Sequence, residues 1–194
     1  MKPLVISAAV CLLALCAAVV ARADSPGLSR GDAEARINAG FTGGDAIRFL
    51  GGGQEQGAPA GGSDFGSARI SPLPAFNGHH VCATSWHPVL VLFVAGGNST
   101  FTRDDADANL PFAAQYTLDG ATLETKLSPI KPVVDPSTTG FEVAYWNAAG
   151  AILSPDTLPV GTHTIQLTLE TPGGTVVGPV VTFYVDGTGT GACL

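Results

Sequence analysis

The chain has 194 residues, of which 16 are acidic and 9 are lysine or arginine, so its net charge is −7. This balance argues against nucleic acid as a partner, because phosphate binding needs basic patches. Only 13% of the residues are charged, while glycine (25) and proline (14) are plentiful, which is typical of a loop-rich β-protein.

The first 23 residues have the form of a cleavable signal peptide. Lys2 supplies a positive charge, residues 4–20 are apolar, and Ala21-Arg22-Ala23 has the small-x-small form that signal peptidase requires. The alternative is a membrane anchor, since a span needs roughly 20 apolar residues. The cleavage site favours removal after Ala23. We therefore expect a secreted or periplasmic protein with no membrane span after signal cleavage.

Residues 24–80 read as an N-terminal segment and linker with little structure of their own. Ser29 and Asp32 resemble a helix-capping pair, and a short helix is expected to end near Gly40. The stretch Gly51–Gly66 is mostly glycine, alanine and small polar residues, which cannot bury enough apolar surface to offset the entropy of ordering them. We predict a largely irregular segment here.

Residues 81–194 read as a series of short strands separated by turn signals. No helix is expected among them, and Trp86-His87-Pro88 is expected to interrupt the pairing because proline donates no ladder hydrogen bond. The pattern predicts an all-β, immunoglobulin-like β-sandwich of about seven strands. The predicted strands are Val81–Ser85, Val89–Val94, Phe112–Leu118, Ala121–Lys126, Phe141–Ala148, a strand from Gly161 to Glu170, and Val176–Val185.

Two of these strands have a clear inward face. Ile165, Leu167 and Leu169 alternate with polar residues, which assigns them to the core. A second set alternates up to Asp119-Gly120, a dipeptide typical of a tight hairpin turn. The inward side chains predicted for this second strand are Phe112, Ala114, Tyr116 and Leu118.

Three segments resemble motifs of bacterial immunoglobulin-like domains. Tyr116–Leu123 resembles their x-T-L-D-G-x-x-L hairpin, Leu153–Thr164 their L-x-x-G-x-H-T lead into the penultimate strand, and Val181–Asp186 their closing x-T-F-x-V-D strand. The resemblance covers about residues 81–193. It implies a binding or adhesion module acting through protein or carbohydrate contacts at the cell surface, at or outside the cell envelope.

The cysteines predict one disulfide. Cys11 and Cys16 leave with the signal peptide, so Cys82 and Cys193 remain as an even pair in an oxidising compartment. A bond between them closes a loop for which the chain-entropy model gives roughly 4–5 kcal/mol as an upper figure.

Two clusters contain metal-ligand residue types. His79, His80 and His87 lie near Cys82 and could bind copper or zinc, which makes a small periplasmic metal-binding protein the alternative function. Against this reading, a disulfide-bonded cysteine is no longer a thiolate. The second cluster fails the EF-hand pattern, but a looser calcium loop and a solvated acidic turn both fit it. It consists of Asp104, Asp105, Asp107 and Asn109.

Two further side chains suggest specific roles. His163 falls on the inward face of its strand, where it is expected to hydrogen-bond a nearby backbone group. Trp146 falls on the face opposite Phe141, Val143 and Tyr145. If that face is exposed to solvent, Trp146 is an exposed binding anchor. If the strand is central, Trp146 belongs to the core. The sequence contains no recognisable catalytic motif, so no enzyme activity is predicted.

Overall fold

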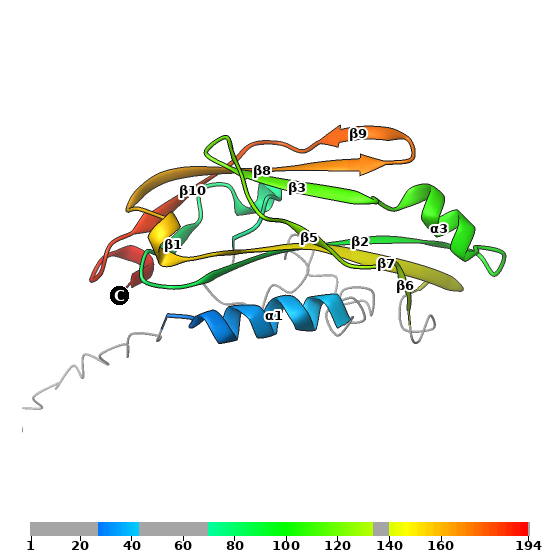
Figure 1. The fold of residues 1–194 in the computed structure, drawn as a ribbon, viewed down its shortest axis with the longest axis horizontal. Helices are drawn as coiled ribbons and strands as arrows, with labels where there is room; N and C mark the ends of the chain where they lie inside the picture. The colour runs from blue at the N-terminus through cyan, green and yellow to red at the C-terminus, as the bar shows by residue number, and fades with distance from the viewer. Residues whose placement is uncertain (1–26, 43–69, 134–139, 194) are drawn as a thin grey trace, which may run out of the picture.

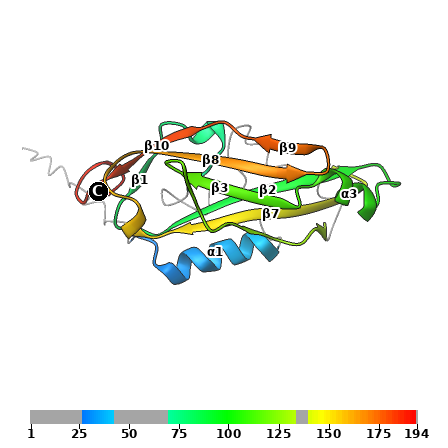
Figure 2. The same ribbon diagram turned by 45° about the horizontal axis from the view of Figure 1, so that its top comes forward.

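The computed structural model describes residues 27–42, 70–133 and 140–193. Within them, two β-sheets pack face to face, and helix α1 (Arg30–Thr42) lies against the outer face of the second sheet (Figures 1 and 2). The prediction of a β-sandwich is confirmed. The predicted signal peptide and the stretch Gly51–Gly66 lie outside the described residues. No helix in the described part of the chain combines the length and apolar character that crossing a bilayer requires.

The first sheet contains six strands in the order β1-β10-β8-β3-β4, and β9 also pairs with β8. Strands β1 and β10 are parallel, and the other neighbours are antiparallel. The strands are β1 (His80–Cys82), β3 (Ala113–Leu118), β4 (Ala121–Thr122), β8 (Gly161–Thr171), β9 (Gly174–Val177) and β10 (Val181–Asp186).

The second sheet is built on two long antiparallel strands, β2 (His87–Gly97) and β7 (Val143–Leu153), which pair over eleven residues each. Two short strands, β5 (Lys126–Leu127) and β6 (Lys131–Pro132), pair with different parts of the other edge of β7. Of the ten strands in the described residues, seven are longer than two residues. The predicted strand Ala121–Lys126 is not a single strand: its ends form β4 and the first residue of β5, which belong to different sheets.

Apolar side chains from the facing sides of the sheets form the main core. In β8, Ile165 is fully buried and Leu167 is 7% exposed, while the flanking polar residues Thr164, Gln166 and Thr168 are half-buried, so the predicted alternation is confirmed. The phenol of Tyr116 donates a hydrogen bond of 2.9 Å to the carbonyl of Ala149 in the opposite sheet. Other buried core residues are Val81, Val89, Val91, Leu118, Ala151, Leu153, Leu158, Val181, Phe183 and Val185.

The predicted hairpin turn joins β3 to β4. Asp119 and Gly120 both have positive φ angles, of 49° and 81°. Two central residues with positive φ define the tight turn that matches the twist of the flanking strands, and glycine tolerates this conformation without a steric cost. The prediction made from the Asp-Gly dipeptide is therefore confirmed.

A second apolar cluster lies between α1 and the outer face of the second sheet. Small residues allow the close approach: a Cβ on Gly40 would lie 2.2 Å from the Leu90 side chain, and one on Gly150 would lie 2.8 Å from Phe41. The buried members of this cluster are Ile37, Leu90, Val133, Ala144, Trp146 and Ala148. The result is a third layer, with α1 covering sheet residues that would otherwise face solvent.

Helix α1 begins as the sequence predicted. The Ser29 hydroxyl accepts a hydrogen bond from the Asp32 N–H (3.2 Å), and it donates one to the Asp32 carboxylate (2.6 Å). The hydrogen bonds from Ser29 hold the pKa of Asp32 below its ordinary value. The helix ends at Thr42, two residues beyond the expected end at Gly40.

The packed sandwich also includes residues that precede the domain boundary expected at residue 81. Ile70 is fully buried and forms an isolated parallel bridge to Val89, with its N–H donating to the Pro88 carbonyl at 3.2 Å. Phe76, in the short 3-10 helix η2 (Pro74–Phe76), is 5% exposed and packs in the same core.

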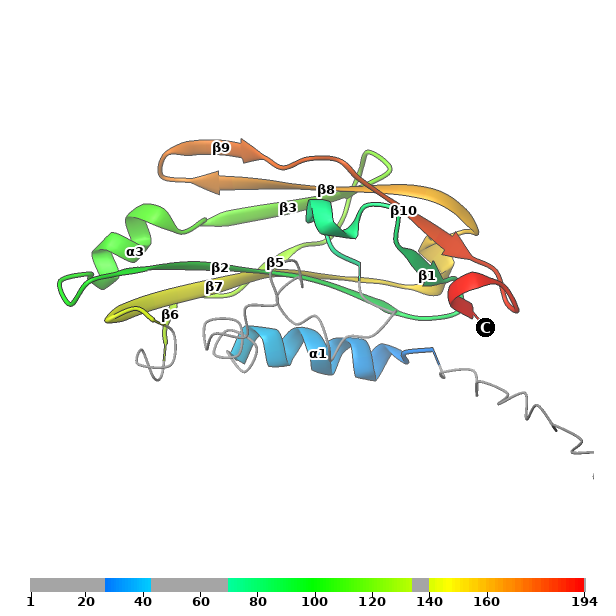
Figure 3. The ribbon, with the colours of Figure 1, turned by 180° about the vertical axis from the view of Figure 1, so that it is seen from behind.

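The predicted disulfide between Cys82 and Cys193 is present. Cys193 ends the short 3-10 helix η5 (Gly191–Cys193), which lies beside β1 at the C-terminal end of the described chain (Figure 3).

The carboxylate of Asp186, at the end of β10, accepts a hydrogen bond from the Ala192 N–H at 2.7 Å. That bond is the main cause of an Asp186 pKa below the ordinary value, and a contact with His80 adds to it.

The break predicted at Trp86-His87-Pro88 lies earlier in the structure, at residues 83–86 between β1 and β2, and proline does not cause it. Strand β2 begins at His87, and Pro88 is its second residue, opposite Ile152 of β7. Antiparallel partners alternate between pairs that exchange hydrogen bonds and pairs that do not. Proline is tolerated at a position of the second kind, where its missing N–H would not have pointed to the partner strand.

The prediction of no helix in residues 81–194 was wrong. Helix α3 (Arg103–Asn109) follows a capping box in which the Thr102 hydroxyl accepts from the Asp105 N–H. The inward assignment of Phe112 was also wrong: its side chain is 67% exposed. The alternation rule applies only within a paired strand, and β3 begins at Ala113.

The predicted last strand is divided in two. Residues 178–180 separate β9 from β10, and within this break the Gly178 N–H donates to the Leu167 carbonyl at 2.8 Å. Pro179 has no N–H to donate, which explains why regular pairing with β8 is interrupted here before it resumes in β10. Val176 and Val177 in β9 are both more than half exposed.

Candidate functional site

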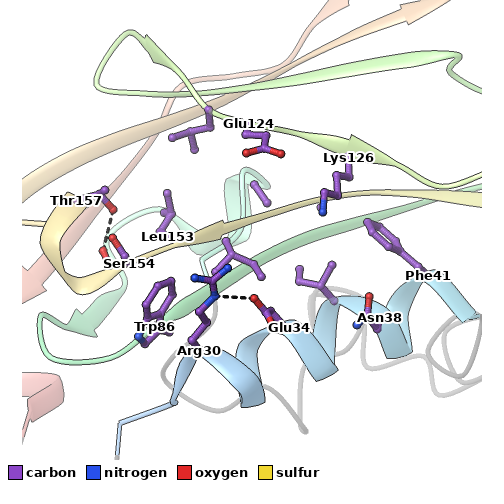
Figure 4. Close-up of a pocket in the computed structure, with 15 residues that line it drawn as sticks. Arg30, Glu34, Asn38, Phe41, Trp86, Glu124, Lys126, Leu153, Ser154 and Thr157 are labelled. Carbon is purple, nitrogen blue, oxygen red and sulfur yellow. Dashed lines mark hydrogen bonds and ion pairs between the residues drawn. The ribbon is translucent and has the colours of Figure 1, made fainter.

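A cleft of about 630 Å³ opens between α1 and the end of the second sheet where β5 meets β7 (Figure 4). This volume lies within the range of roughly 300–1,000 Å³ that is usual for ligand sites. Its lining combines aromatic, aliphatic, charged and small polar groups. The lining residues are Arg30, Glu34, Ile37, Asn38, Phe41, Trp86, Leu123, Glu124, Lys126, Gly150, Ala151, Ile152, Leu153, Ser154 and Thr157.

The wall formed by α1 is fixed by packing and by one ion pair. Ile37 is buried against the sheet, so the residues on the neighbouring side of the helix face the cleft. Arg30 donates from Nε to the Glu34 carboxylate at 2.7 Å, one helical turn away. That hydrogen bond, with the charge of Glu34, raises the pKa of Arg30 above its ordinary value. Asn38 is exposed and leaves its amide available at the cleft.

Trp86 lies beside the first turn of α1. The Arg30 guanidinium carbon lies 5.7 Å from the centre of the Trp86 ring, and the main-chain N–H of Trp86 donates to the Leu28 carbonyl at 2.9 Å. A cation over an aromatic face is attracted by the quadrupole of the ring. These contacts hold the indole at the cleft and cover one of its faces.

The C-terminal end of α1 is held by Lys131. Its ammonium donates to the Phe41 carbonyl at 2.7 Å and lies 5.7 Å from the centre of the Trp146 ring. A lysine at this end of a helix satisfies an otherwise unpaired carbonyl and interacts favourably with the helix dipole. Lys131 therefore joins α1 to the second sheet behind the cleft.

The opposite wall comes from the segment that leads into β5. Glu124 and Lys126 are exposed and project into the cleft from this segment (Figure 4). Ser154 and Thr157 close one end, where the Thr157 hydroxyl donates to the Ser154 carbonyl at 2.7 Å. The lining thus carries two basic and two acidic side chains, together with main-chain atoms of β7.

The three histidines of the predicted metal cluster do not converge. His79 packs against Phe76 with the rings tilted and their centres 4.5 Å apart, and His80 Nδ1 lies 3.0 Å from the Asp186 carboxylate. His87 is fully buried, with Nε2 2.9 Å from the Cys82 carbonyl. No group of three or more histidine, cysteine, aspartate or glutamate side chains suited to a metal ion occurs among the described residues.

The acidic cluster lies on helix α3 and not on the loop that a calcium site would require. The Asp105 carboxylate receives hydrogen bonds from the N–H and hydroxyl of Thr102, and they lower its pKa below the ordinary value. Asp107 pairs with Arg103 at 3.0 Å, and Asn109 donates to the Asp105 carbonyl at 2.6 Å. Asp104 is exposed in the first turn of the helix. Residues three or four apart on a helix share a face, so Asp104 lies with Asp107 and Asp105 with Asn109, and no group of three metal-ligand side chains forms among the described residues.

Trp146 is not an exposed binding anchor. It is 2% exposed, because α1 covers the face of β7 to which it belongs. The sequence allowed either an exposed or a core position for Trp146, and the structure shows that it belongs to the core.

His163 is buried on the inward side of β8, as predicted. Its Nε2 lies 2.7 Å from the Pro159 carbonyl, and its Nδ1 lies 2.7 Å from the Asp119 carboxylate at the hairpin turn. Burial acts to raise the pKa of Asp119, but hydrogen bonds from His163 and Thr164 outweigh it and lower the pKa below its ordinary value. This histidine joins two turns and has a structural role.

Sequence reasoning did not find the residues of the cleft. Trp86 was read only as part of a strand break, and Arg30, Asn38 and Lys126 carried no signal. The one usable clue was the capping pair at Ser29, which predicted a helix but not where it packs.

No known protein-family model matches the sequence, and no curated protein is significantly similar to it.

Proposed function

We propose that this chain is an exported binding module in which an immunoglobulin-like sandwich presents the cleft beside α1 to a protein or carbohydrate at or outside the cell envelope. The observation that carries the proposal is the composition of the cleft, in which Trp86 and Phe41 lie among charged and amide groups. Aromatic and arginine side chains are the residues that most often dominate binding energy at interfaces.

Two features support the exported setting. The Cys82–Cys193 disulfide suits an oxidising compartment, because thiols are kept reduced in the cytosol. The sequence of residues 1–23 has the form of a signal peptide, and the motifs quoted above resemble those of bacterial immunoglobulin-like domains.

The test uses two tryptophan substitutions on α1. Asn38→Trp fills the cleft, while Ala39→Trp adds the same side chain at an exposed position that does not line it. The purified wild type and both variants are immobilised and exposed to a panel of purified bacterial and host-cell glycans and of envelope proteins. We expect at least one ligand to bind the wild type and Ala39→Trp, and to bind Asn38→Trp at least tenfold more weakly. Equal binding to all three proteins, or no ligand at all, would contradict the proposal.

A further inference from the structure

The edge of β7 that borders the cleft lacks a neighbouring strand over its last residues, as far as residues 27–42, 70–133 and 140–193 are concerned. Strand β5 pairs with β7 only through Lys126, opposite Gly150, and Leu127, opposite Ala149. In the part of the chain that the structure describes, no strand pairs with residues 151–153 on that side. A free strand edge presents main-chain donors and acceptors at the spacing of a β-ladder.

The residues that precede β5 cannot cover this edge, because they are bonded to the other sheet. The Leu123 N–H donates to the Tyr116 carbonyl at 2.9 Å, and the Leu123 carbonyl receives the Gln115 amide at 2.6 Å. The Thr125 hydroxyl accepts from the Tyr116 N–H at 2.9 Å. The segment thus crosses from the first sheet to the second and reaches β7 only at Lys126.

The main-chain groups of Ile152 point toward the open edge. The carbonyls of Ala144 and Ala148 accept hydrogen bonds from the Val133 and Ser128 N–H groups, at 2.9 and 2.8 Å, on the β5 and β6 side. In a strand, every second residue directs its N–H and C=O to the same side, so Ile152 directs its groups there too. On the opposite side, Ile152 is paired with Pro88 of β2. Since the main-chain groups of Ile152 point away from β2, no N–H is needed from the proline.

We propose that the occupant of the cleft is an extended polypeptide segment of a partner protein, which adds to β7 as a strand and exchanges hydrogen bonds with Ile152. The inference rests on the proposed binding function and specifies its ligand. Strand addition is a general mode of peptide recognition, in which main-chain bonds supply affinity and alternate side chains supply specificity.

The charges of the cleft fit such a segment. Glu124 and Lys126 are two residues apart, which is the spacing of side chains on one face of an extended chain, roughly 7 Å. No ion pair joins either of them to another described residue. We therefore expect the bound peptide to carry one basic and one acidic side chain, two residues apart, which face Lys126 and Glu124.

A peptide fits the cleft better than a sugar does. A sugar has no repeating amide groups that could pair with a strand edge, whereas a peptide backbone does. The Ile152 groups lie in the plane of the sheet at the open edge, where an extended chain continues the ladder of β5.

The experiment follows hydrogen exchange at single amides by NMR. The probe is the tightest binder selected from a phage-displayed library of random twelve-residue peptides, counter-selected against Asn38→Trp. In the free protein the Ile152 amide should exchange faster than those of Ala151 and Leu153, which point to β2. Saturating peptide should slow exchange at Ile152 at least tenfold. Unchanged exchange at Ile152 in the saturated complex would overturn strand addition.

Backbone-methylated peptides supply the second readout. Methylating one amide at a time should weaken binding at least tenfold at one amide that pairs with Ile152, and by less than threefold at its two neighbours. Peptides that bind wild type and Ala39→Trp but show no such alternation would refute the inference and leave the proposed function standing. If the library yields no cleft-dependent peptide while a glycan passes the test above, the ligand class is wrong. If neither binds, the proposed function fails as well.

Discussion

The packing of α1 against the second sheet leads to a prediction that tests the three-layer architecture. Ile37 is 5% exposed and belongs to the cluster that contains both Leu90 and Trp146. Substituting Ile37 by alanine removes three buried carbons, which corresponds to about 2.4 kcal/mol at about 0.8 kcal/mol per buried methylene. Because α1 is a single outer layer that can settle into the space, we expect a total loss of about 2–3 kcal/mol, the lower part of the usual range.

The assay is urea unfolding followed by tryptophan fluorescence and by circular dichroism. The chain has two tryptophans, and both lie next to α1: Trp86 contacts Arg30, and Trp146 is in the buried cluster. Fluorescence therefore reports on helix docking as well as on global unfolding. With a slope of about 2 kcal/mol per molar urea, the expected loss for Ile37→Ala lowers the midpoint by about 1 M.

Asn38→Ala is the matched control, because Asn38 is the next residue on the same helix and is exposed. It should change the stability by no more than about 0.5 kcal/mol. Equal effects of Ile37→Ala and Asn38→Ala would refute the packing of α1 on the sheet. A fluorescence change that precedes the circular-dichroism transition in the wild type would mean that the helix detaches before the sandwich unfolds.

Three further predictions concern the sandwich itself. Leu167→Ala should cost roughly 2–5 kcal/mol and Thr168→Ala well under about 1 kcal/mol in urea unfolding, and comparable losses would contradict the assigned inward face of β8. The folded-state pKa of Asp119 is lowered, so its ionised form stabilises the fold above about pH 4, and this contribution is lost as the pH falls through the folded pKa. The stability advantage of wild type over Asp119→Asn, measured by urea unfolding, should therefore be larger at pH 7 than at pH 3, and an advantage that does not shrink would refute the role of the charge. Mass spectrometry after alkylation without reductant should detect a Cys82–Cys193 linked peptide and no free thiol, and Cys193→Ser should lose up to roughly 4–5 kcal/mol of stability.

The features that could be predicted from the sequence are those with a local cause. The alternation around Leu167, the Asp119-Gly120 turn and the capping pair at Ser29 each depend on a few adjacent residues. The disulfide was also predictable, because only two cysteines follow the signal sequence and each had one available partner.

The third layer could not be predicted in the same way. The face of β7 that α1 covers consists largely of Ala144, Ala148 and Gly150, whose small side chains look neither clearly buried nor clearly exposed in the sequence. The buried residues of α1, Ala33, Ile37 and Gly40, form only a weakly apolar stripe. Whether Trp146 was core or surface depended on this contact, so the alternation rule alone could not decide it.

The cleft depends on an equally non-local event. It exists because the chain leaves the first sheet after Thr125 and joins the second at Lys126, and the bonds that fix this crossing come from the neighbouring strand β3. Its walls come from four separate stretches of sequence. No local pattern marks such a meeting point.

The disulfide also determines how the fold would respond to tension. Residues 83–192 lie inside the covalent loop that Cys82 and Cys193 close, so a pulling force applied between Leu28 and Cys193 bypasses all strands except β1. The Leu28 carbonyl accepts a hydrogen bond from the main-chain N–H of Trp86, four residues beyond Cys82. Leu28 and the disulfide are therefore both attached to the short segment 82–86. In single-molecule pulling, only residues before Cys82 should extend while the disulfide is intact. The strands that follow Cys82 therefore carry no load, whereas α1, η2 and β1, which lie at or before this cysteine, do.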